Sequence, residues 1–144
     1  MRFTRLLAFF LISVAACHAH HMAVVVNHEN SVGAVPSSQL AKIFRAELRK
    51  WPDGKEVVLV LHKDSSGEAA TLEHLSNMSL REFRAFVAAH KESITTVEND
   101  DDVLKVVEAL PGAIGLVNVR SINDQVRVLK VDGKLPLEEG YLPH

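Results

Sequence analysis

The sequence predicts a single three-layer α/β domain with a mixed, mostly parallel sheet. Strand-like and helix-like segments alternate along most of the chain, which is typical of sheets covered by helices. Residues 57–61, VVLVL, are apolar without alternation, as expected for a strand buried on both faces. Two strand-like segments, AIGLVNV and VRVLKV, follow each other without an intervening helix. They are therefore expected to form an antiparallel pair.

The first elements follow from short local patterns. Residues 22–27, MAVVVN, form a β-branched run that ends in polar residues, which predicts the first strand. Ser37 or Ser38 can cap a helix, and Pro52 in a WPDG turn must end it before the strand at 57–61. The apolar face of this helix is expected to consist of Leu40, Ile43, Phe44 and Leu48.

Two capping boxes predict the next two helices. Ser65 with Glu68 begins a helix with few residues on its apolar face, and Ser79 with Glu82 begins a helix with a more complete apolar face. A strand at ITTV and a helix with an acidic first turn, DDD, come next. The acidic run lacks the later glycine and glutamate of a calcium loop, so we interpret it as favourable charge at a helix N-terminus.

The first residues have the order of a secretory signal. Arg2 and Arg5 precede the apolar stretch 6–16, which is followed by small residues. We therefore expect residues 1–19 to be a signal peptide and residues 20–144 to form the domain. The predicted location is periplasmic or otherwise exported.

Cys17 follows Val-Ala-Ala, a stretch that resembles a bacterial lipobox. Lipidation at Cys17 and ordinary cleavage near Ala19 both remain open. No later segment approaches the roughly 18 apolar residues of a membrane helix. Contact with a membrane is thus expected only through the signal or a lipid anchor.

Composition excludes several classes of function. The formal net charge is −2 and no basic face is evident, so no nucleic-acid partner is predicted. Cys17 is the only cysteine, which excludes an internal disulfide. No cysteine or closely spaced carboxylate completes a metal-ligand set with the histidines near the start, so neither a metal nor a cofactor is predicted. Those histidines are His18, His20, His21 and His28.

The stretch HKDSSGEAAT, residues 62–71, is the candidate functional motif. A strand, a Ser/Gly turn and a helix N-terminus in this order form a natural anion cradle, because the first N–H groups of a helix are unpaired. Ser65 and Ser66 would add hydroxyl donors, and Gly67 would allow close approach to the backbone. The alternative is that Ser65 only caps the helix. No nucleophile elbow G-x-S-x-G is present, so we predict that the protein is not an enzyme.

Four stretches, AVVVN, LAKIFRAELRKWPDG, KDSSG and LPGAIGLV, together resemble the succession found in the phosphate-binding periplasmic proteins of ABC transporters, in the type 2 periplasmic binding protein class. The resemblance covers about residues 22–119. It implies one lobe of that fold, recognition of a small oxyanion such as phosphate, and an ABC transporter as partner. The chain is long enough for only one of the family's two lobes, which implies weak capture unless another protein supplies the second wall.

In that family the turn typically reads arginine, two residues, glycine, serine, glycine, threonine. Carried over, His62 takes the arginine position, Ser65 and Gly67 the glycine positions, Ser66 the serine and Glu68 the threonine. Histidine cannot supply the bidentate fork of arginine, and Glu68 places a carboxyl beside the anion. These departures leave an alternative function open, an envelope protein-interaction or sensory module that kept the fold and lost the ligand.

Overall fold

The computed structural model describes residues 21–63 and 65–142, apart from the side chain of Ser66. The predictions for the signal peptide at 1–19 and for Cys17 lie outside these residues. The strands are β1 (Met22–Val26), β2 (Ala34–Val35), β3 (Val58–His62), β4 (Ile94–Val97), β5 (Ala113–Asn118), β6 (Arg127–Val128) and β7 (Lys130–Val131). The helices are α1 (Ser37–Phe44), α2 (Ser66–Ser76), α3 (Leu80–Ala89), α4 (Asp100–Ala109) and the 3₁₀ turn η1 (Val119–Ser121).

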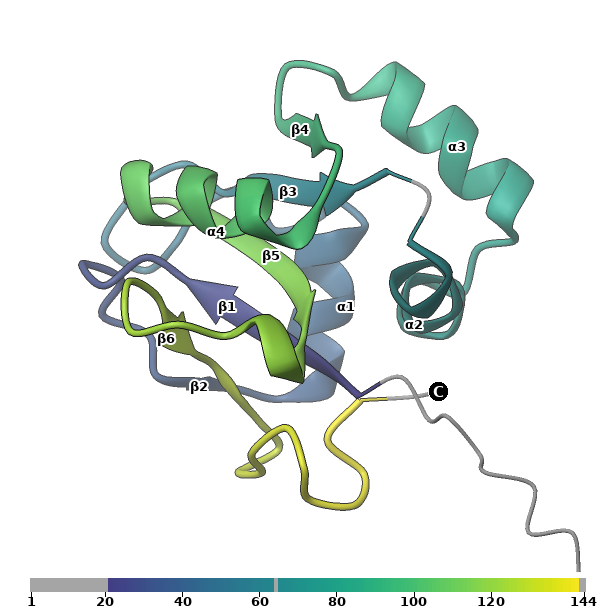
Figure 1. The fold of residues 1–144 in the computed structure, drawn as a ribbon. Helices are drawn as coiled ribbons and strands as arrows, with labels where there is room; N and C mark the ends of the chain where they lie inside the picture. The colour runs from purple at the N-terminus through teal and green to yellow at the C-terminus, as the bar shows by residue number, and fades with distance from the viewer. Residues whose placement is uncertain (1–20, 64, 143–144) are drawn as a thin grey trace, which may run out of the picture.

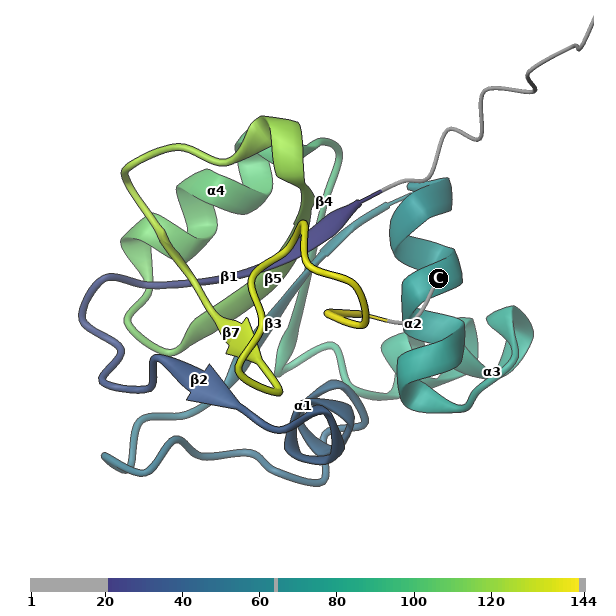
Figure 2. The same ribbon diagram turned by 90° about the horizontal axis from the view of Figure 1, so that it is seen from below.

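The main sheet has five strands in the order β4-β3-β5-β1-β6, and β2 pairs in parallel with β7 beside it (Figure 2). Strand β3 is parallel to both β4 and β5, whereas β1 is antiparallel to both β5 and β6. The predicted mixed α/β sheet is confirmed. The expected pairing of the two closing strands with each other is wrong, because β1 lies between them.

Helices cover both faces of this sheet, which gives three layers (Figure 1). Leu40, Ile43 and Phe44 of α1 are fully buried in one core cluster, as the helical spacing predicted. On the other face, α4 packs directly on β5. A Cβ at Gly115 would lie 2.7 Å from Val103 Cγ1, so the missing side chain permits this close approach.

Helix α1 differs from its prediction at both ends. Its N-cap is Pro36, and neither Ser37 nor Ser38 caps it. Instead, the Ser37 N–H donates to Asp132 Oδ1 at 2.8 Å, which ties the helix start to the turn after β7. The helix ends at Phe44, so Leu48, the last residue of the predicted apolar face, lies beyond it.

The parallel arrangement brings the carboxyl ends of β3, β4 and β5 to one edge of the sheet. Helices α2 and α4 begin just after β3 and β4, so their N-termini lie at this edge.

The C-terminal segment is held by Tyr141, whose hydroxyl donates to the carbonyl of Leu129 and accepts the Val24 N–H at 3.2 Å. Burial raises the pKa of Tyr141 to about 12. Within the described range, no helix is long and apolar enough to span a bilayer.

Candidate ligand-binding site

The loop between β3 and α2 forms the predicted turn. Ser65 is the N-cap of α2, and its Oγ accepts the Glu68 N–H at 3.3 Å. Ser66 and Gly67 occupy the first helical positions, whose N–H groups have no partner within a helix. Gly67 is buried, whereas His62 and Ser65 are partly exposed. The turn therefore presents only part of its surface to solvent.

The carboxyl group of Glu68 folds back under this turn. Glu68 is 1% exposed, and its Oε2 accepts the backbone N–H of His62 at 2.9 Å. Its Oε1 is buried without a hydrogen-bond partner among the described residues. Burial raises the pKa of Glu68 well above its usual range, the His62 N–H opposes this, and the charge of Asp100 adds to it. Folding therefore shifts the ionisation equilibrium of this carboxyl toward its protonated, uncharged form.

His62 is fixed by a carboxylate from another element. Its Nδ1 lies 2.9 Å from Asp100 Oδ1 in the first turn of α4. Asp100 Oδ2 also accepts the Asn118 N–H at 3.0 Å and the Ser121 hydroxyl at 2.7 Å. Because an ionised carboxylate only accepts hydrogen bonds, the proton of this pair lies on Nδ1. A ligand could then be contacted only through the other ring nitrogen of His62, Nε2.

The structure brings His62, Ser65, Gly67 and Glu68 together in this turn, with Gly67 buried, while the side chain of the fifth predicted residue, Ser66, lies outside its described part. Sequence reasoning missed Asp100, which it treated only as helix-capping charge. Asn99 is the actual N-cap, with its Oδ1 2.9 Å from the Asp102 nitrogen. A signal was available, because Asp100 follows a strand expected to be parallel to β3, and such strand ends meet at one edge.

A cleft of about 540 Å³ adjoins the turn. It opens between α2 and α3, which lie next to each other beyond the end of β3 (Figure 1). Its lining residues are Leu61, His62, Lys63, Ser65, Glu68, Ala69, Leu72, Leu80, Phe83, Arg84, Val87 and Thr96. Lys63 and Arg84 form no ion pair with a described residue, so the cleft has a cationic rim.

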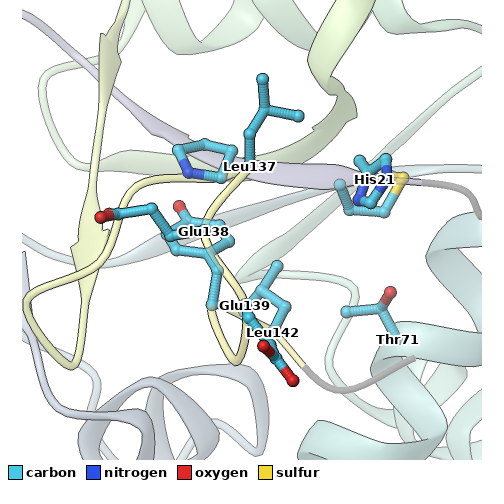
Figure 3. A pocket seen from close by; sticks show the side chains of 9 residues that line it. His21, Thr71, Leu137, Glu138, Glu139 and Leu142 are labelled. Atoms are coloured by element: carbon cyan, nitrogen blue, oxygen red, sulfur yellow. The ribbon is translucent and has the colours of Figure 1, made fainter.

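A second cavity of about 240 Å³ lies between the C-terminal segment, the start of β1 and α2 (Figure 3). Glu138 and Glu139 contribute two carboxylates to its lining, which disfavours an anion. Trp51 is also remote from the candidate site, since it is buried and its Nε1 donates to the Gly112 carbonyl at 2.9 Å. In the described chain, no cluster of three or more His, Cys, Asp or Glu residues could hold a metal.

A mixed sheet between helix layers, with polar groups gathered at its carboxyl edge, defines one lobe of a periplasmic-binding-protein-like fold. The chain is similar to an ABC-type phosphate transport receptor from Vibrio cholerae, with a TM-score of 0.68 and 22% identity over 81% of this chain and 48% of that one. It is also similar to PstS from Borrelia burgdorferi, with a TM-score of 0.60, 18% identity, and coverage of 81% and 49%. It is likewise similar to a phosphate-binding protein from Stenotrophomonas maltophilia, with a TM-score of 0.66 and 15% identity over 81% of this chain and 40% of that one.

The family model described as the PBP superfamily domain matches residues 18–140, so the chain belongs to this family. It spans about half the length, or less, of the solved structures above. The resemblance inferred from the sequence is thereby confirmed at the level of family and fold. At these identities the solved structures support the shared fold alone.

Proposed function

We propose that this protein is an exported, non-catalytic, solute-binding-like protein that recognises a small oxyanion such as phosphate weakly at residues 62–68. The observation that supports this most is the capped start of α2 beside an open cleft with a cationic rim. The N–H groups of a helix N-terminus attract anions, and Lys63 and Arg84 add positive charge nearby. The similar proteins from Vibrio cholerae and Stenotrophomonas maltophilia, a phosphate transport receptor and a phosphate-binding protein, agree with this ligand class.

Weak rather than tight binding follows from two contacts. His62 is held by Asp100 and has no bidentate fork to offer. Glu68 already accepts the His62 N–H, a group that an anion at the strand end could otherwise use. The raised pKa of its buried carboxyl lessens the charge repulsion that the sequence suggested, but it does not release this donor.

This lobe covers only one side of a bound anion, and solvent on an uncovered side would weaken each electrostatic contact. An envelope protein or an ABC transporter could cover that side, and we propose such a partner. We also keep residues 1–19 as the proposed export signal, with Cys17 as the candidate lipidation site. Mass spectrometry of the membrane fraction would reveal acyl chains on Cys17, and an unmodified mature start elsewhere would contradict lipidation.

Thermal unfolding of the purified domain during titration with phosphate, sulfate and chloride tests anion recognition. An anion at 100 times its dissociation constant stabilises the protein by about 2.7 kcal/mol, which raises Tm by about 10 °C. If neither phosphate nor sulfate raises Tm beyond the effect of chloride at concentrations up to millimolar, the proposed site is excluded.

The double variant His62→Arg with Glu68→Thr should strengthen phosphate binding, because it adds a guanidinium fork and frees the backbone donor. Glu73→Thr is the matched control, since Glu73 is exposed on the same helix. If the double variant binds phosphate no better than this control does, the turn is only a helix cap.

A second candidate function is a protein-interaction or sensory module of the envelope. The buried carboxyl of Glu68 favours it, because this group takes the place of a ligand acceptor at the His62 N–H. Under this alternative, none of the anions shifts Tm, while pull-down from envelope extracts recovers a partner that a charge reversal at Arg84 releases. Anion-dependent stabilisation would contradict it.

A further inference from the structure

We propose that the cleft between α2 and α3 selects organic oxyanions, in which a phosphate, sulfonate or carboxylate group is attached to an apolar body. This inference rests on the proposed function, because the turn at residues 62–68 would hold the charged group. It adds the class of ligand, which an inorganic anion alone does not satisfy.

The size of the cleft is the first argument. A water molecule occupies about 30 Å³ of liquid, and phosphate is only a few times larger. The cleft measures about 540 Å³, within the usual range of small-molecule sites, about 300–1,000 Å³. Inorganic phosphate would leave most of this space filled with water.

The distribution of chemistry along the cleft is the second argument. Three polar lining residues, His62, Lys63 and Ser65, come from the end of β3 and the turn after it, and Thr96 adds a hydroxyl group from the neighbouring strand β4. The walls contributed by α2 and α3 are mainly apolar, apart from Arg84 and the buried carboxyl group of Glu68. These apolar residues are Ala69, Leu72, Leu80, Phe83 and Val87. A ligand with a charged head and an apolar body matches both parts.

Glu68 gives an independent indication of a ligand. It borders the cleft, is 1% exposed, and has a buried Oε1 without a hydrogen-bond partner among the described residues. A buried polar atom is seldom left unpaired in a native protein. A carboxylic O–H at this position could donate to an oxyanion seated over the turn once the neighbouring side chains adjust.

Isothermal titration of the full domain with inorganic phosphate, phenyl phosphate and benzyl alcohol tests the inference. Burial of a phenyl ring should make phenyl phosphate bind about tenfold to a hundredfold more tightly than phosphate. Benzyl alcohol, which lacks the anionic group, should bind more weakly than phenyl phosphate by a similar factor.

Two variants with matched controls locate the ligand. Ala69→Leu fills the apolar wall and should abolish the advantage of phenyl phosphate over phosphate, whereas Ala70→Leu, exposed on the same helix and outside the cleft, should not. Arg84→Gln should weaken both anions severalfold, and Arg81→Gln, exposed on α3 and away from the cleft, should not. Circular dichroism confirms that each variant is folded.

The outcomes separate this inference from the proposed function. Equal affinity for phosphate and phenyl phosphate would overturn the organic ligand and leave oxyanion recognition standing. Benzyl alcohol binding as tightly as phenyl phosphate would show a purely apolar pocket and overturn the inference. If neither anion binds, both the inference and the proposed function fail.

Discussion

Replacing Glu68 with glutamine removes one titrating proton from the centre of the candidate site and keeps the shape of the side chain. The amide oxygen can still accept the His62 N–H, and the amide nitrogen takes the place of the unpaired Oε1. The largest effect on the pKa of Glu68 is burial, which raises it. Glutamine should therefore mimic the protonated state that the fold prefers.

The sign of the pH dependence follows from linkage. Below the unfolded pKa of Glu68, near 4.5, both states are protonated and the favourable contribution to stability is complete. As pH rises toward the raised folded pKa, the unfolded chain releases its proton first, and wild-type stability falls by up to about 1.4 kcal/mol per pH unit. The Glu68→Gln variant lacks this loss, so its advantage over wild type should grow with pH and then level off.

Urea unfolding of wild type and Glu68→Gln at several pH values from 4 to 9 measures this difference. Glu73→Gln, at an exposed position of α2, is the control for removing a charge from the helix. In a thermal unfolding experiment, each 1 kcal/mol of difference in stability would appear as about 4 °C in Tm for a domain of this size. The reasoning would be refuted if Glu68→Gln lost stability relative to wild type as pH rises, because the ionised carboxylate would then be the form that the fold stabilises.

Three further substitutions test the surroundings of the site by urea unfolding. Asp100→Asn weakens an acceptor that joins three elements and should lower the free energy of unfolding by about 1–3 kcal/mol. The control Asp101→Asn, at an exposed position, should lose only the favourable interaction of its charge with the helix dipole, about 0.3–1 kcal/mol. Equal costs for the two variants would contradict the bridging role of Asp100. Gly112→Ala places a Cβ 1.9 Å from the Glu56 backbone oxygen and should destabilise by about 3 kcal/mol or more, so a neutral effect would argue against this close packing. Tyr141→Phe leaves two buried backbone groups unpaired and should cost about 1–3 kcal/mol, and an unchanged midpoint would show that the C-terminal segment is not held by the hydroxyl.

Local patterns predicted most helices and strands because their causes are local. The spacing of Leu40, Ile43 and Phe44 specifies one helical face, and Ser65 and Ser79 accept the N–H three residues on, as capping requires. The continuous apolar run that became β3 indicated burial on both faces. Family membership was also accessible, since it depends on the order of such segments.

The pairing of β1 with both β5 and β6 could not be predicted in this way. An apolar strand buried on both faces is compatible with many neighbours, and nothing in Met22–Val26 specifies which strands lie beside it. The same limit applies to the short β2–β7 pair, whose residues lie almost a hundred positions apart. Strand order depends on the packing of the whole sheet.

The candidate site was predicted in part. The strand, turn and helix order identified the position of Ser65, but the capping-box spacing suggested that Glu68 would reach back to the helix start. It reaches the His62 N–H instead, because the buried side chain finds a donor on the adjacent strand. The contact of Asp100 with His62 joins residues 38 positions apart, which a local pattern cannot show.

Residue-resolved amide shifts during a phosphate titration test the central claim most directly. In ¹H–¹⁵N spectra of the labelled domain, the account predicts saturable shifts centred on Ser65, Ser66 and Gly67, with chloride at equal ionic strength producing none. Shifts that are absent, or that concentrate away from this turn, would contradict anion recognition at the start of α2.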